Sequence, residues 1–214
     1  KIFLMVRKAM LQVRPQTKIM LPNGNWTFAI PFLQDPDTRE LFDGVKMDYQ
    51  FYQRLPEQQM HQCSIHSMLY FWDAWNKYRK APPLLALGEG PGISQIYPGA
   101  NDAETAAALQ IRAAILMAGY GVAHQHAVAY RLIDSGENHC SGGFLDNEVT
   151  RNPHPSYSTF AAFSRHTRHA VFESYTNPGS FSAYCANFHN AKSGKFFRAI
   201  WSIRGIREFL FDTD

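Results

Sequence analysis

A continuous apolar run, Leu84-Leu85-Ala86-Leu87, leads directly into the glycine-rich segment Gly88-Glu89-Gly90-Pro91-Gly92. A short uninterrupted apolar run is typical of a strand that is buried on both faces of a parallel sheet. Two prolines at positions 82 and 83 end the helical pattern that comes before it, so the strand is predicted to start at Leu84. Glu89 then lies one glycine beyond the predicted strand, where the flanking glycines let backbone and ligand approach closely.

Helical and strand-like segments alternate on both sides of this run. Helices are predicted over residues 1–14, 32–42, 58–80, 102–118 and 157–168, and strands over residues 18–21, 45–52, 84–87 and 126–133. Such alternation indicates a parallel sheet with crossover helices, and therefore an α/β fold. The pattern fits a closed barrel and an open, doubly wound sheet equally well.

The character of the chain changes after about residue 170. Residues 181–188 and 195–203 are aromatic and β-prone, and Asn190-Ala191-Lys192-Ser193-Gly194 between them is a favourable hairpin turn. We therefore expect two domains, with the α/β part in residues 1–170 and the start of a β-sandwich-like domain in residues 171–214.

The charge pattern excludes several classes of partner. The formal net charge of +3 is spread along the chain without a basic cluster, so neither nucleic acid nor a membrane surface is expected as a partner. No stretch is long and apolar enough to span a bilayer.

Three cysteines, at positions 63, 140 and 185, are far apart and form no CxxC pair. They allow one disulfide and one thiol, or three thiols, so the compartment cannot be read from them.

Glu89 is the first candidate catalytic residue. A residue that follows a barrel strand emerges at the carboxyl-terminal mouth, where barrel enzymes hold their active sites. A carboxylate in that place suits nucleophilic attack on an anomeric carbon. The alternative is a loop glutamate that accepts hydrogen bonds from nearby backbone N–H groups, and position alone does not separate the two.

Several motifs resemble the clan A glycoside hydrolases in order and spacing. Leu85-Ala86-Leu87-Gly88-Glu89-Gly90 is similar to the clan's strand-seven motif, in which the final glutamate is the nucleophile. An alanine-rich helix, a strand-eight segment and the end of the barrel follow in Asp102 to Ala118, Val128-Ala129-Tyr130-Arg131-Leu132 and Asn152-Pro153-His154-Pro155-Ser156-Tyr157. Upstream, Val13-Arg14-Pro15-Gln16-Thr17-Lys18-Ile19 and Tyr49-Gln50-Phe51-Tyr52 resemble the approach to strand five and strand six.

The resemblance implies a partial (β/α)8 TIM barrel, strands five to eight, and retaining hydrolysis of O-glycosidic bonds in a carbohydrate substrate. Glu89 would be the nucleophile, Tyr52 would hydrogen-bond to it or else pack in the core, and Tyr130 would contact the sugar. The clan's acid/base glutamate ends strand four, which would precede Lys1. We therefore expect the chain to need the remainder of its own polypeptide for activity, and we expect no cofactor.

Three further carboxylates, on Glu57, Asp134 and Glu137, follow predicted strands. Glu57 is a candidate substrate-binding residue at the same mouth, although a surface or capping charge is the alternative for all three. Paired histidines, His124 and His126, could share a metal ion from one face of a strand. Five more residues have a spacing or position that could also serve a metal ion, namely His61, Cys63, His66, His139 and Cys140.

The sequence is compatible with two rival functions. One is a non-catalytic carbohydrate-binding or scaffold protein on the same barrel, because the tryptophan often found on strand eight is replaced by Ala129 or Tyr130. The other is a metal-dependent hydrolase that uses His124 and His126. Satisfied or exposed histidines are the simpler interpretation, so no metal site is expected.

Overall fold

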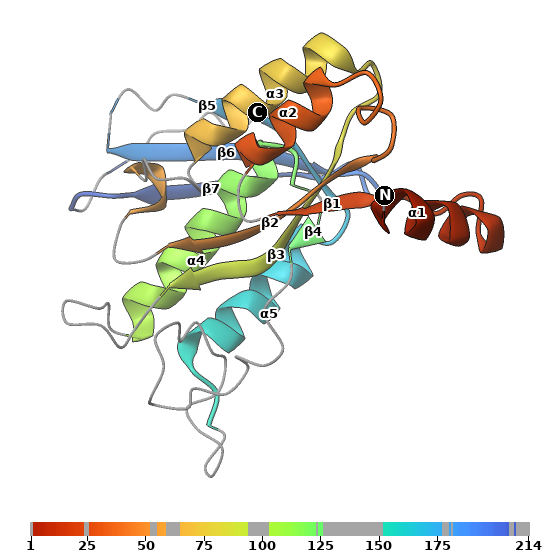
Figure 1. Ribbon diagram of the computed structural model, residues 1–214. Coiled ribbons are helices and arrows are strands. Elements are labelled where there is room, and N and C mark those ends of the chain that lie inside the picture. Colours follow the sequence, from red (N-terminus) through yellow and green to blue (C-terminus); the bar gives the residue numbers. More distant parts are fainter. Residues whose placement is uncertain are drawn as a thin grey trace.

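The computed structural model describes residues 2–23, 26–51, 55–58, 65–93, 103–122, 124–125, 152–176, 180, 182–205 and 208. Within these residues the chain forms a four-stranded parallel sheet, a three-stranded antiparallel sheet and several helices (Figure 1). The fold is therefore mixed α/β, as the alternating pattern predicts. No helix in this part of the chain has the length and apolar character needed to cross a membrane.

In chain order the elements are α1 (Ile2–Val13), β1 (Met20–Asn23), η1 (Trp26–Phe28), α2 (Ala29–Gln34), β2 (Gly44–Phe51), η2 (Pro56–Gln58), α3 (Ile65–Tyr78), β3 (Leu84–Ile93), α4 (Ala103–Gly119), β4 (His124–Gln125), α5 (Pro155–Thr167), β5 (Ala170–Thr176), β6 (Ala183–Asn190) and β7 (Phe196–Ser202). The α-helices and the strands β1 to β3, β6 and β7 follow one another in the predicted order, whereas β5 and the two 3-10 helices were not predicted. Strand β4 covers residues 124–125 next to the predicted strand 126–133, which lies outside the described residues.

The prediction for the second helix is wrong in its bounds. It placed the helix over residues 32–42, whereas α2 covers Ala29–Gln34. Asp35, which precedes Pro36, has an extended ψ of 118°, because a residue before proline avoids the helical region. Pro31 is accommodated in the first turn of α2, where a helix needs no backbone donor.

The parallel sheet has the strand order β1-β2-β3-β4, so each strand pairs with the next one along the chain. Leu21, Val45 and Leu85 are aligned across β1, β2 and β3, and all three side chains are buried. These aligned residues belong to one hydrophobic cluster with buried residues of the three crossover helices: Ala29 and Leu33 of α2, Met68, Phe71 and Trp75 of α3, and Leu109, Ala113, Leu116 and Met117 of α4. Helices α2, α3 and α4 therefore pack against the same face of the sheet.

The antiparallel sheet has the strand order β5-β6-β7, and the predicted hairpin turn joins β6 to β7. Asn190 Oδ1 accepts the backbone N–H groups of Lys192 and Ser193 at 2.9 and 3.0 Å. Gly194 has a φ of +68°, a conformation that glycine adopts without strain. The turn residues thus act as the sequence predicts.

Helix α4 forms a layer between the two sheets, as Figure 1 shows. While Leu116 and Met117 pack in the cluster of the parallel sheet, Ile115 packs with Ala186 and Phe188 of β6. The expected boundary at residue 170 coincides with the first residue of β5. The antiparallel sheet nevertheless shares its hydrophobic contacts with α4, so the second sheet is packed directly on the α/β part.

Helix α1 differs from the others, because none of its residues is buried. Its exposed residues Ile2, Met5, Val6, Ala9, Met10 and Val13 have the i, i+3, i+4, i+7 spacing of one helical face. Ile2 and Val13 are 79% and 84% exposed. In Figure 1 this helix projects beyond β1, the first strand of the parallel sheet. An apolar helical face therefore lies uncovered beside that strand.

Candidate functional site

Glu89 lies inside β3, the third strand of the parallel sheet. The prediction that this strand ends at Leu87 is wrong, since β3 continues to Ile93. The neighbouring strand β2 runs to Phe51. The two strands stay paired beyond Glu89, with Gln50 opposite Gly92 and Phe51 opposite Ile93. Backbone hydrogen bonding to a neighbouring strand therefore outweighs the weak strand preference of the glycines. Two register shifts interrupt this part of the ladder, the kind of irregularity at which proline is tolerated in a sheet.

Glu89 is aligned with Asp48 of β2 in the ladder between the two strands. Paired strands lie about 4.8 Å apart, so these two acidic residues occupy neighbouring backbone positions. Asp48 was not predicted from the sequence as a site residue. The sequence does contain a feature that indicates a special role for this residue, because an acidic side chain interrupts the otherwise strand-like stretch of residues 45–52.

Most other predicted site residues lie outside the described part of the chain. This group comprises Tyr52, Tyr130, Asp134, Glu137, His61, Cys63, His126, His139 and Cys140. His124 is the first residue of β4 and pairs with Ala86, and His66 lies in the first turn of α3. Among the residues that the structure describes, no group of three His, Cys, Asp or Glu side chains is placed to hold a metal ion. Cys185, the cysteine within these residues, is a buried free thiol.

Glu57 forms a buried ion pair. It lies in η2, between β2 and α3, and its two carboxylate oxygens accept hydrogen bonds from Arg112 Nε and Nη2 at 2.8 and 2.6 Å. The side chains of Glu57 and Arg112 are only 1% and 14% exposed. Two parallel N–H···O bonds to a carboxylate are the strongest geometry that arginine offers, and they fix both groups.

Trp201 of β7 completes this arrangement. Its indole N–H donates to Glu57 Oε1 at 2.7 Å, and its ring stacks on Tyr184 of β6 with a centroid separation of 5.2 Å and an interplanar angle of 7°. Burial raises the pKa of the Tyr184 phenol, and the negative charge of Glu57 raises it further. Glu57 thus connects η2, α4 and the antiparallel sheet, and both of its oxygens are committed to protein donors.

This connection was not predicted from the sequence, which indicated for Glu57 either a substrate-binding residue at the mouth or a surface or capping charge. The position of Arg112 indicates a buried ion pair, because this residue lies between apolar residues in the alanine-rich helix α4. A charged group buried among apolar side chains needs a partner of opposite charge. The identity of that partner depends on packing between segments that are far apart in sequence.

Comparisons with protein-family models, with curated proteins and with solved structures find no match for this chain.

Proposed function

We propose that this chain is the nucleophile-bearing part of a retaining glycoside hydrolase, and that Glu89 is the nucleophile. The observation that carries the proposal is the position of Glu89 beyond the midpoint of β3, a strand that pairs in parallel with β2 and β4 and that pairs with β2 at Glu89 itself. Carboxyl-terminal halves of parallel strands are where α/β enzymes bring their reactive groups together.

The winding of the sheet supports a partial (β/α)8 TIM barrel, strands five to eight. Sequential parallel strands with α2, α3 and α4 on one face match a barrel, in which all helices lie outside the ring of strands. An open doubly wound sheet carries helices on both faces and reverses its strand order. The uncovered apolar face of α1 beside β1 also fits a barrel that continues in that direction, where a preceding strand and helix would cover it.

In the proposed reaction a Glu89 carboxylate oxygen bonds to the anomeric carbon while the bond to the leaving-group oxygen breaks. A glutamic acid upstream of this chain donates its proton to the leaving oxygen. The same group, now a carboxylate, takes a proton from water. The water oxygen then attacks the anomeric carbon and releases Glu89. Tyr52 would orient Glu89 by a hydrogen bond, and Tyr130 would stack on the sugar.

Covalent trapping tests the nucleophile without requiring the acid/base residue. Dinitrophenyl deoxyfluoro glycosides have a leaving group that departs unprotonated, and their fluorine slows hydrolysis of the glycosyl-enzyme. A panel of gluco, galacto, xylo and manno probes is incubated with the protein, and labelled peptides are mapped by mass spectrometry. We expect a label on Glu89 with at least one probe, and its loss in Glu89→Gln.

The matched control is Glu104→Gln, which changes an exposed glutamate in the first turn of α4 and should leave the labelling unchanged. In the full polypeptide, Glu89→Gln should lower kcat by several orders of magnitude. Activity within tenfold of the parent would exclude Glu89 as the nucleophile. Sugar binding without any covalent label would favour the carbohydrate-binding scaffold. Stoichiometric zinc would favour the metal-dependent hydrolase.

A further inference from the structure

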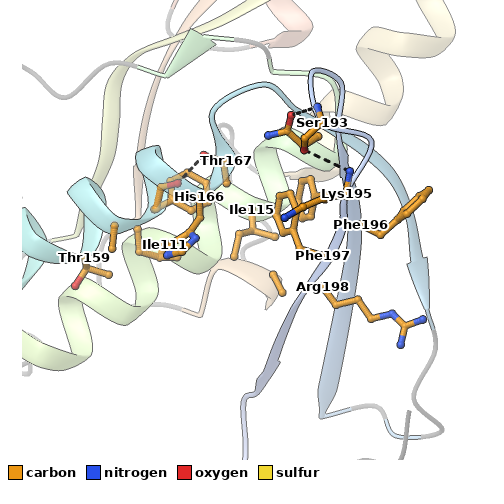
Figure 2. A pocket seen from close by; sticks show the side chains of 15 residues that line it. Ile111, Ile115, Thr159, His166, Thr167, Ser193, Lys195, Phe196, Phe197 and Arg198 are labelled. Carbon is orange, nitrogen blue, oxygen red and sulfur yellow. Dashed lines mark hydrogen bonds between the residues drawn. The ribbon is translucent and has the colours of Figure 1, made fainter. Parts of the chain in front are cut away.

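A groove of about 630 Å³ lies between the helices and the second sheet. Helices α4 and α5 form one wall, and the β6–β7 hairpin forms the other (Figure 2). The floor is apolar and consists of Ile111, Ile115, Phe163, Phe188, Phe197 and Ala199. A second hollow of about 370 Å³ shares Phe163, Thr167 and Phe188 with it and extends the apolar surface. Volumes of this size are typical of small-ligand sites.

The two threonine hydroxyls of the α5 wall are already hydrogen-bonded within the protein. Thr159 and Thr167 donate their hydroxyl hydrogens to the carbonyl oxygens of Pro155 and Phe163, at 2.7 and 2.8 Å within their own helix. These two hydroxyls are therefore not free to donate to the hydroxyl-rich surface of a sugar. The chemistry of the groove favours an alkyl or aryl body, which gains about 25 cal/mol for each Å² of apolar surface removed from water.

The charged side chains in the lining, those of Lys195 and Arg198, are both positive. Lys195, which follows the hairpin turn, and His166, in the last turn of α5, border the apolar floor from opposite walls (Figure 2). Among the described residues that line the groove there is no aspartate or glutamate. A carboxylate at this rim would meet the Lys195 ammonium and the His166 imidazole without facing a negative charge.

We propose that this groove binds an amphipathic carboxylate, with its alkyl chain on the apolar floor and its carboxylate beside Lys195. The site is distinct from Glu89, and the proposal does not depend on glycosidase activity. The apolar floor supplies affinity, and the positive rim selects the charge of the head group.

Three probes share the same alkyl tail and differ only in the head group, so their affinities show the effect of the head group. They are dodecanoate, dodecyltrimethylammonium and dodecyl maltoside, each used below its critical micelle concentration. Binding is measured by isothermal titration calorimetry. We expect dodecanoate to bind at least tenfold more tightly than the other two. Equal affinity for all three, or tightest binding of the maltoside, would overturn the proposal, the latter because the groove would then be a sugar site.

Two pairs of matched variants locate the binding. Lys195→Glu should weaken dodecanoate binding at least tenfold, whereas Lys192→Glu, in the exposed turn just before it but outside the lining, should stay within twofold. Ala162→Trp should fill the groove and abolish binding, whereas Ala161→Trp changes the neighbouring exposed residue of α5, which does not line it. Circular dichroism checks that each variant is folded. Unchanged binding in Lys195→Glu and Ala162→Trp would refute the assignment.

Discussion

The indole N–H of Trp201 donates to the carboxylate of Glu57 at 2.7 Å, across 144 positions of sequence. The same carboxylate holds Arg112, so one side chain joins the segment after β2, the helix after β3 and the last strand of the second sheet. The antiparallel sheet is therefore attached to the α/β part by a directional polar contact as well as by apolar packing. Removal of this contact should affect folding more than any exposed ion pair.

Glu57→Gln tests this connection. The substitution keeps the size of the side chain but leaves the Arg112 guanidinium, which is 14% exposed, without an opposite charge. Breaking one side of a buried ion pair costs about 3–5 kcal/mol, so we expect a loss of that order in the free energy of unfolding. Urea denaturation followed by tryptophan fluorescence and by circular dichroism measures it.

The exposed ion pair between Lys18 and Asp43 provides the control. Its side chains are 66% and 33% exposed at a separation of 3.2 Å, so Lys18→Met should cost less than about 1 kcal/mol. The double variant Glu57→Gln with Arg112→Met should recover part of the loss, because no uncompensated charge then stays buried. Equal effects of Glu57→Gln and Lys18→Met would contradict the assignment.

Gly119→Ala should destabilise the protein, although alanine is the better helix former. A Cβ atom at position 119 would collide with the Tyr175 hydroxyl and come within 2.8 Å of its Cζ and 3.2 Å of Phe172 Cε2. Such overpacking typically costs about 1–3 kcal/mol, against a helical gain of about 1 kcal/mol. Thermal unfolding measures the difference. Tyr175→Phe removes the atom nearest to the new methyl group and should restore part of the loss, and the absence of any rescue would argue against this contact.

Tyr175 should also make stability depend on alkaline pH. Burial, followed by the neighbouring Tyr120, raises the pKa of the Tyr175 phenol above its usual 10.0. Although the whole side chain is 42% exposed, its hydroxyl lies against Gly119 and the Leu116 carbonyl, so the burial of the titrating oxygen is the relevant quantity. A raised pKa in the folded state means that the unfolded chain loses this proton first. The contribution to stability is therefore complete below pH 10 and declines as the pH rises above it.

Urea midpoints between pH 8 and pH 11 measure this effect. We expect the decline above pH 10 to be shallower in Tyr175→Phe than in the parent, by a fraction of the ~1.4 kcal/mol per pH unit that one fully shielded group would give. Tyr70→Phe is the comparison, because that ring is 66% exposed in the folded protein. A decline of the same steepness in Tyr175→Phe and the parent would remove Tyr175 from this role.

The uncovered face of α1 should promote self-association of the 214-residue chain. Contiguous exposed apolar side chains on a helix mark an interaction surface. The double variant Met5→Lys with Val13→Lys changes residues that are 71% and 84% exposed, so it should lower concentration-dependent association in analytical ultracentrifugation with little change in stability. Phe3→Lys, at a residue packed against the core, should instead destabilise the fold. Association that is the same in the parent and the double variant would count against this surface.

Local sequence determined much of this architecture. Hydrophobic periodicity and proline positions predict α1, α3, α4 and α5 and the strands β1, β2 and β3, because each signal arises within a few residues of the element it specifies. The hairpin turn from Asn190 to Gly194 was predictable for the same reason, since its side-chain and glycine conformations are local.

Only the tertiary structure decided the features that depend on contacts between residues far apart in the sequence. Ile93 rather than Leu87 ends β3, because hydrogen bonds from β2 hold glycines and a proline in a strand that they would not form alone. Glu57 is a buried connector, because Arg112 and Trp201 reach it only after α4 and β7 have packed. The common face of α2, α3 and α4 is likewise absent from any local pattern. Periodicity tells which residues of a helix are buried, whereas only the path of the folded chain tells against which side of a sheet they are buried.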